Sequence, residues 1–180
     1  MARVPWVDSV DLPTPGPGSR RKNNISRALS NSPGAARQNM ETGLYIRHGS
    51  RLDPRLRELA ILQVGYFVGN HYQFAHHVEI AISLGVPEQD IRAIAEETEG
   101  RKSHLEPLAR SALSAAREMT SSVSLCQETF DALRAGLDNE CLVDLLFAIA
   151  TYNSIVRILA SLEVDLEDEY RPLLDRFPLR

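Results

Sequence analysis

Helix start and stop signals recur along the chain, and they constrain its fold more than any other feature. Asp53-Pro54 is typical of a helix start, because Asp can accept the free amides of the first turn and Pro at the first helical position loses no needed donor. Gly69 suits the end of that helix. Asn70 and Gln73 then have the spacing of a capping box, which starts a second helix directly after the first.

The rest of the chain from Asn23 onward shows the same punctuation, without the alternating β-branched runs that indicate strands. We therefore predict an all-α fold with a single helical domain over residues 23–180. Gly85 ends the second helix of the pair and Pro87 opens the next. Further helices are expected at about 33–48, 87–98, 103–120, 127–136 and 139–162.

Residues 1–22 are predicted to form an extended arm, because prolines and glycines interrupt any helical period there. Two interpretations of the arm stay open: a mobile terminus, or a strap across a neighbouring subunit. Val4, Trp6 and Leu12 would favour the strap, because they offer apolar contacts.

Composition narrows the class of partners. The formal charge of −4 is spread without a basic stripe, so nucleic acid is not expected as a partner. Cys126 and Cys141 stand apart, which indicates neither a disulfide framework nor a zinc knuckle. The start of the chain lacks a signal-peptide pattern and no uninterrupted apolar stretch approaches a membrane span, so we expect a cytoplasmic protein without membrane contact.

The helix expected at 139–162 is apolar on almost every side, notably from Leu142 to Ala150. Such a helix is typically surrounded by protein. The pattern predicts a central helix or one that lies between subunits. On the same helix Asn153 and Arg157 form an i, i+4 pair, and a guanidinium held there would suit a substrate carboxylate. A structural salt bridge or a contact between subunits is the alternative.

A candidate proton-transfer pair spans the two helices around Gly69. At 100° per residue, His77 lies in the apolar stripe of the second helix, whereas His71, His76 and Glu79 point toward solvent. On the first helix Glu58 shares a face with Gly65, which leaves room for a ligand or a close helix. A buried Glu/His pair can exchange a proton near neutral pH.

Other interpretations of these residues remain open. Glu58 and His77 could be a hydrogen-bonded core pair, and Asn70 and Gln73 have a sufficient role as helix caps. No metal is expected, because adjacent histidines project about 100° apart on a helix and rarely share an ion.

Two segments resemble the carboxymuconolactone decarboxylase and alkylhydroperoxidase D-like family over roughly residues 30–165. They are Leu52-Asp53-Pro54-Arg55-Leu56-Arg57-Glu58-Leu59-Ala60-Ile61-Leu62 with Gly69-Asn70-His71-Tyr72-Gln73-Phe74-Ala75-His76-His77, and the stretch from Leu142 to Arg157. The resemblance implies an alkylhydroperoxidase D-like helical bundle. It also implies a homo-oligomer, a trimer or a hexamer.

This sequence departs from the family pattern at two positions. In the family's peroxidase branch a glutamate, a Cys-x-x-Cys pair and a histidine follow one another; Glu58 and His77 match the outer members, but Asn70 and Gln73 stand at the cysteine positions. Neither amide can form a disulfide, so the peroxide-reducing cycle is not expected. The decarboxylase-like branch implies a cofactor-independent lyase of aromatic catabolism that acts on a small anionic metabolite, a carboxylated lactone.

On this reading the residues have distinct roles. His77 is the catalytic proton donor or shuttle and Glu58 its partner, while Asn70, Gln73, Asn153 and Arg157 are candidates for substrate contacts. Two alternatives remain: a non-catalytic oligomeric binding or accessory protein on the same scaffold, and a hydroperoxidase that uses Cys126 or Cys141.

Overall fold

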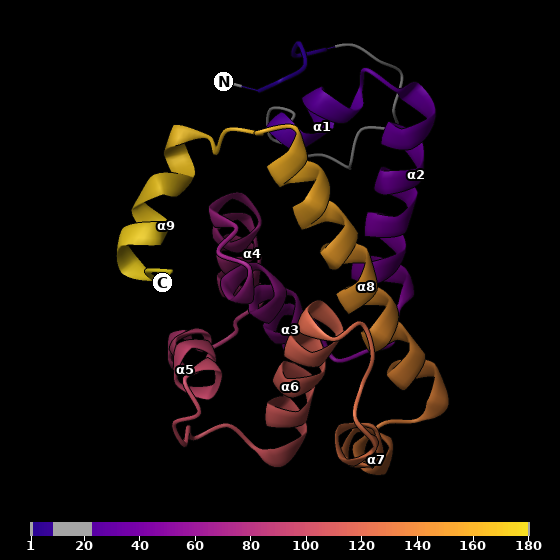
Figure 1. Cartoon of the computed structure of the whole chain (residues 1–180), viewed down its shortest axis with the longest axis vertical. Coiled ribbons are helices and arrows are strands. Elements are labelled where there is room, and N and C mark those ends of the chain that lie inside the picture. The colour runs from indigo at the N-terminus through magenta and orange to yellow at the C-terminus, as the bar shows by residue number, and fades with distance from the viewer. Residues whose placement is uncertain (1, 9–22, 180) are drawn as a thin grey trace.

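The structure is a computed structural model that describes residues 2–8 and 23–179, and this part of the chain contains helices and no β-strand. The helices are arranged around α3, as Figure 1 shows. Their bounds are α1 (Asn24–Leu29), α2 (Pro33–Leu44), the π-helix η1 (Tyr45–Gly49), α3 (Pro54–Phe67), α4 (His71–Ser83), α5 (Glu88–Thr98), α6 (Pro107–Ser121), α7 (Gln127–Gly136), α8 (Asn139–Ser161), the 3-10 turn η2 (Asp168–Tyr170) and α9 (Arg171–Arg176).

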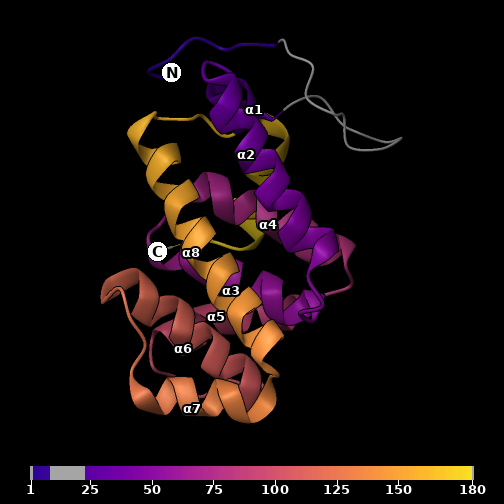
Figure 2. The ribbon, with the colours of Figure 1, turned by 90° about the vertical axis from the view of Figure 1, so that its right-hand side faces the viewer.

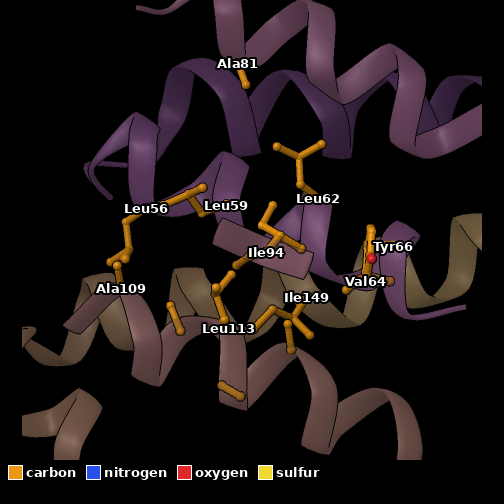
Figure 3. Close-up of a cluster of buried hydrophobic side chains, with 14 of the residues drawn as sticks. Leu56, Leu59, Leu62, Val64, Tyr66, Ala81, Ile94, Ala109, Leu113 and Ile149 are labelled. Carbon is orange, nitrogen blue, oxygen red and sulfur yellow. The ribbon is translucent and has the colours of Figure 1, made fainter. Parts of the chain in front are cut away.

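Helix α3 is the centre of the core. Its residues from Leu56 to Tyr66 are all buried, and α4, α5, α6 and α8 pack around it. In Figure 3 Leu56 of α3 lies beside Ala109 of α6, and Leu62 of α3 lies on the side of Ala81 of α4. Ile94 of α5 lies between the α3 leucines and Leu113 of α6. A helix that is apolar on most sides is stable only when other helices cover those sides, and the central position of α3 provides that cover.

The start of α3 and the turn between α3 and α4 both follow the sequence signals closely. Asp53 accepts a hydrogen bond from the backbone of Leu56, and Gly69 adopts a φ of +66°, a conformation that glycine reaches without strain. The Asn70 side chain accepts from the Gln73 amide at 2.9 Å, so the predicted cap is confirmed.

The second half of the expected capping box is wrong. Gln73 does not reach back to the backbone of Asn70; its Nε2 donates to the carbonyl of Ile61 at 2.8 Å, across the interface with α3. The Asn70 amide instead donates to the carbonyl of Gly65. Tertiary contact between the two helices therefore takes the Gln73 side chain away from its local partner.

Two helix boundaries differ from expectation. Helix α6 begins at Pro107 rather than near 103, because the preceding loop is held by other contacts: His104 and Arg55 both bind the buried carboxylate of Asp90, at 2.8 and 2.6 Å. The expected helix at 33–48 continues as a π-helix over its last turn, η1. The short α9 was not predicted; its Pro172 lies in the first turn, where proline is tolerated.

The N-terminal residues 2–8 lie against the chain's own helices. The Arg3 amide donates to the carbonyl of Leu162 at 2.8 Å, and Val7 donates to Arg27. The Arg27 guanidinium lies over the ring of Trp6 at 5.2 Å. The two alternatives for the arm, a mobile terminus or a strap across a neighbour, stay predictions, and residues 9–22 lie outside the described residues.

The expectation that His76 and Glu79 point to solvent is wrong, because the C-terminal segment covers them. The His76 ring is stacked between Tyr72 and Tyr170, with centroids at 4.5 and 3.9 Å, and its Nε2 lies 2.8 Å from Glu167. Tyr170 donates to Glu79. A helical projection of one helix carries no information about a segment that returns from ninety residues away. His71 is exposed, as expected.

Helix α8 runs diagonally across the molecule beside α2 (Figures 1 and 2). Its inner side packs on α3, but Val143 and Phe147 are 62% and 43% exposed on the outer side. By length and hydropathy alone α8 could cross a membrane, a test that core helices also pass. Its buried polar groups, Asp144 and Asn153, are hydrogen-bonded within the protein.

Candidate functional site

Glu58 and His77 form the buried pair that the sequence predicts. They lie on the facing sides of α3 and α4, which the tight turn at Gly69 makes neighbours. Nδ1 of His77 is 2.8 Å from Oε2 of Glu58. Glu58 is 0% exposed and His77 is 6% exposed, so the carboxylate is enclosed and the ring lies at the edge of the core.

Arg57 completes the pair, and the sequence analysis missed it. Its Nε donates to Oε1 of Glu58 at 3.0 Å, and its Nη1 donates to the carbonyls of Ile46 and Arg47 in η1 at 3.3 and 3.5 Å. Neighbouring positions on a helix project about 100° apart, so a helical projection separates Arg57 from Glu58. The long arginine side chain bridges that angle. The adjacency Arg57-Glu58 in an otherwise apolar helix was the signal available.

The charges of this triad determine the state of Glu58. Burial alone would raise the pKa of Glu58, but His77 on one carboxylate oxygen and Arg57 on the other together lower it below its usual value. Glu58 is therefore a carboxylate with both oxygens occupied. The Nδ1–H of His77 is its hydrogen-bond donor, which leaves Nε2 as the ring atom that can accept or release a proton.

Tyr152 of α8 closes the other side of His77. The two rings meet edge to face, with centroids 4.5 Å apart and planes at 85°. Tyr152 packs on a small apolar cluster of Ile46, Ile61 and Ala148. Tyr152 lies within the stretch from Leu142 to Arg157 that resembles the family, but no local spacing connects it to His77.

The four residues expected to contact substrate have other partners in this chain. Asn70 caps α4, and the Gln73 side chain fills the space above Gly65. Of the two alternatives predicted for that space, a ligand or a close helix, the structure shows the close helix. Asn153 and Arg157 are paired as predicted, at 2.9 Å, but Asn153 also donates to Thr120 and Arg157 is exposed. None of the contacts described for these four residues is with Glu58 or His77.

Two surface pockets lie near these residues. The first has a volume of about 360 Å³ and lies between the start of α4, the end of α8 and α9; its lining includes Asn70, Glu163 and Arg171. The second, of the same volume, is an open groove along α8 at Arg157. Neither of these two pockets reaches Glu58 or His77. Within the described residues, no group of three or more His, Cys, Asp or Glu is placed to hold a metal ion.

A comparison with known families decides the relationship. Residues 33–118, which hold α2 to α5, most of α6 and therefore Arg57, Glu58 and His77, match the carboxymuconolactone decarboxylase family. This part of the chain, which carries the triad, belongs to the carboxymuconolactone decarboxylase family.

Solved structures share the fold of this chain. A protein of unknown function from Agrobacterium tumefaciens, suggested to be the antioxidant defence protein AhpD, is 22% identical with a TM-score of 0.69, covering 81% of this chain and 99% of that one. A peroxidase-related protein from Silicibacter sp. TM1040 is 16% identical with a TM-score of 0.74, covering 94% and 97%. The debrominase Bmp8, in a form with one cysteine replaced by alanine and bound to 2,3,4-tribromopyrrole, is 20% identical with a TM-score of 0.75, covering 84% and 81%. No match was found among the curated proteins.

The described contacts of the two cysteines are with residues outside the triad. Cys126 caps α7 and contacts Glu118 and Thr129. Cys141 lies in the first turn of α8, about 16 Å along the helix axis from Tyr152, the residue that contacts His77. Burial and Asp138 raise the pKa of the Cys141 thiol, which opposes formation of a thiolate. These positions do not favour a thiol-based peroxidase.

Proposed function

We propose that the protein is a cofactor-independent carboxy-lyase or related proton-transfer enzyme that acts on a small carboxylated lactone of aromatic catabolism. One observation carries the proposal. The Glu58 carboxylate is enclosed, its two oxygens are bound by Arg57 and His77, and His77 is thereby oriented with Nε2 as its reactive nitrogen. Such an orientation of the imidazole is what general acid–base catalysis needs.

The reaction would use the triad in a single proton transfer. The bond between a substrate carbon and its carboxylate breaks, carbon dioxide leaves, and the electron pair stays on the substrate as a dienolate conjugated with the lactone carbonyl. His77 then delivers a proton from Nε2 to the carbon and regains one from solvent. Glu58 stabilises the positively charged ring that precedes the transfer, and Arg57 keeps Glu58 ionised.

The experiment is an assay for carbon dioxide release from γ-lactones that carry a carboxyl group, run in deuterated water. We expect turnover, with one deuterium incorporated at the carbon that loses the carboxylate. His77→Ala should reduce kcat by about 10²–10⁴-fold, the usual contribution of a general acid. His71→Ala, an exposed histidine at the start of the same helix, is the matched control and should retain activity. Full activity of His77→Ala on a turned-over lactone would refute the assignment.

A second candidate function is supported by the near-complete burial of the pair. Glu58 is fully enclosed, and neither of the two pockets described above reaches it. A non-catalytic binding or accessory protein would use the Arg57–Glu58–His77 contacts only to join α3 and α4. The lactone assay separates the two candidates, because the accessory protein would show no turnover with any lactone while His77→Ala would lower its stability.

We also propose that the protein acts as a homo-oligomer, a trimer or a hexamer, in the cytoplasm. The support is the outer stripe of α8, where Val143, Phe147 and Ala150 are exposed at i, i+4 and i+7 spacing. Tyr45 of η1 extends this stripe through its edge contact with Phe147 at 6.2 Å. Contiguous exposed apolar residues of this kind mark protein interfaces more often than free surface.

A further inference from the structure

The hydroxyl of Tyr152 lacks a hydrogen bond to any residue that the structure describes. Its ring is fixed between His77 and the cluster of Ile46, Ile61 and Ala148, and the side chain is only partly exposed. The hydroxyl is not one of the enclosed polar atoms that lack a partner, so it is reached by solvent, where a ligand can replace water. Within residues 2–8 and 23–179, this phenol is held in place by its ring and leaves its polar end available.

The ring contact with His77 places Tyr152 beside the triad, and the charges around it keep its hydroxyl protonated. Burial raises the pKa of Tyr152 and the Glu58 carboxylate raises it further, while Arg47 and Arg57 act in the opposite direction. The net effect is a rise, so the phenol stays protonated at neutral pH. Tyr152 is therefore a hydrogen-bond donor whose ring lies against the ring of His77.

Arg47 supplies a positive charge from the position next to Ile46, which belongs to the cluster that Tyr152 packs on. It lies in η1, is exposed, and its Nε donates to the carbonyl of Gly43 at 3.1 Å. Among the described residues no carboxylate lies within ion-pair distance of its guanidinium, unlike Arg51 and Arg55, which each pair with two carboxylates. A guanidinium in this state can bind a carboxylate with both of its outer nitrogens.

The π-helix that carries Arg47 is fixed on both sides. Asp144 of α8 accepts hydrogen bonds from Tyr45 at 2.8 Å and from Ser50 at 2.6 Å, at the two ends of η1. The Arg57 guanidinium binds the η1 carbonyls of Ile46 and Arg47. The backbone of Arg47 is thus tied to the residue that holds Glu58. Single-turn π-helices of this kind are frequent at functional sites.

We propose that Tyr152 and Arg47 form the substrate-binding half of the site, in place of Asn70, Gln73, Asn153 and Arg157. The Tyr152 hydroxyl donates to the substrate carbonyl oxygen on which charge develops, and Arg47 binds a carboxylate of the substrate. The substrate class is a small carbonyl compound with a carboxylate. This assignment rests on the proposed proton transfer by His77, and it predicts which residues set binding rather than which residue moves the proton.

Benzoate is a suitable probe, with benzamide as its neutral counterpart. Binding is followed in the full-length protein by NMR of ¹³C-labelled histidine, with the His77 signal assigned from a His77→Gln variant. We expect benzoate to shift the His77 signal saturably, and Arg47→Gln to weaken benzoate binding by about tenfold or more, a loss typical of one charge-assisted contact. Benzamide binding should be insensitive to Arg47→Gln.

Two further variants keep the result interpretable. Tyr152→Phe should weaken benzoate binding several-fold while leaving the thermal midpoint unchanged, because the hydroxyl makes no hydrogen bond within the described protein. Arg51→Gln removes the same charge from an exposed arginine whose partners, Asp138 and Glu140, lie elsewhere, and should change binding by less than about twofold.

The assignment is overturned by three results. These are no saturable benzoate shift at His77, affinities of Arg47→Gln and Tyr152→Phe both within twofold of the wild type, or an equal loss in Arg51→Gln. If any of these results is obtained while carbon dioxide release still depends on His77, only the binding assignment is refuted. If benzoate binds as expected but no lactone is turned over, only the proposed reaction is refuted.

Discussion

The side-chain amide of Gln73 occupies the space that a Cβ on Gly65 would fill. An ideal Cβ at Gly65 would lie 1.6 Å from Oε1 and 2.8 Å from Cδ of Gln73. Gln73 cannot move away easily, because it is 2% exposed and its Nε2 is bonded to Ile61. The absence of a side chain at Gly65 is therefore what lets α3 and α4 approach closely and bring Glu58 to His77.

Gly65→Ala should consequently destabilise the protein by about 1–3 kcal/mol, the usual cost of overpacking a core contact. The free energy of unfolding in urea measures this. Gly34→Ala is the matched control: it lies in helix α2 with nothing within 4 Å of its Cβ position, so it should be neutral or stabilising by up to about 1 kcal/mol. Equal behaviour of the two variants would contradict the close packing at Gly65.

Arg57→Gln should be one of the most damaging single changes in the chain. It leaves the enclosed Glu58 carboxylate without its arginine, and removing one partner of a buried ion pair typically costs about 3–5 kcal/mol. Arg51→Gln removes an exposed arginine that pairs with Asp138 and Glu140, and it should cost no more than about 1 kcal/mol. Urea unfolding of both variants at pH 7 makes the comparison; a similar small loss in each would show that Arg57 does not sustain Glu58.

Acid should weaken the fold partly through Glu58. Because its pKa is lower in the folded protein than the usual value of 4.5, the contribution of Glu58 to stability is complete above that value and is lost as the pH falls through the folded pKa. The free energy of unfolding of the wild type should thus decline below about pH 4.5 more steeply than that of Glu58→Gln. Glu167, whose pKa is also lowered, contributes equally to both proteins, so the difference isolates Glu58. Parallel curves would contradict the lowered pKa.

Phe147→Glu should dissociate the proposed oligomer, because it places a charge in the middle of the exposed stripe of α8. Light scattering should report a change from the assembled mass to the 20.1 kDa of one chain. Val123→Glu changes an even more exposed apolar residue outside the stripe and should leave the assembly intact. A wild-type protein that is already monomeric, or an oligomer that survives Phe147→Glu, would contradict the role of this stripe.

Much of the fold could be predicted because its signals are local. Asp53, Asn70 and the glycines after α3 and α4 act on the adjacent backbone, so their effects are the same in the sequence and in the structure. The late start of α6 and the covering of His76 by Tyr170 and Glu167 depend on contacts with distant residues. Periodicity within one helix carries no trace of such contacts.

The candidate site also has a part that could be predicted from local signals and a part that could not. Glu58 and His77 share a predictable hairpin, and their contact follows from two helix faces and one short turn. Arg57 was missed because its role depends on the reach of its side chain, and Tyr152 because it comes from α8, seventy-five residues after His77. Arg47, the proposed carboxylate-binding residue, was not predicted because it lies in the π-helix η1, where the sequence predicted only the end of an α-helix.

The sequence alone determined the all-helical fold, the family, the turn between α3 and α4 and the identity of the buried pair, since each rests on caps, spacing or a local motif. Only the tertiary structure decided that Gln73 fills the space above Gly65, that Arg57 joins Glu58 to η1, and that Tyr152 lies on His77. The physical reason is that a hydrogen bond or a ring contact depends on where distant backbones place two side chains. That placement is settled by packing around α3, which no single segment of the sequence contains.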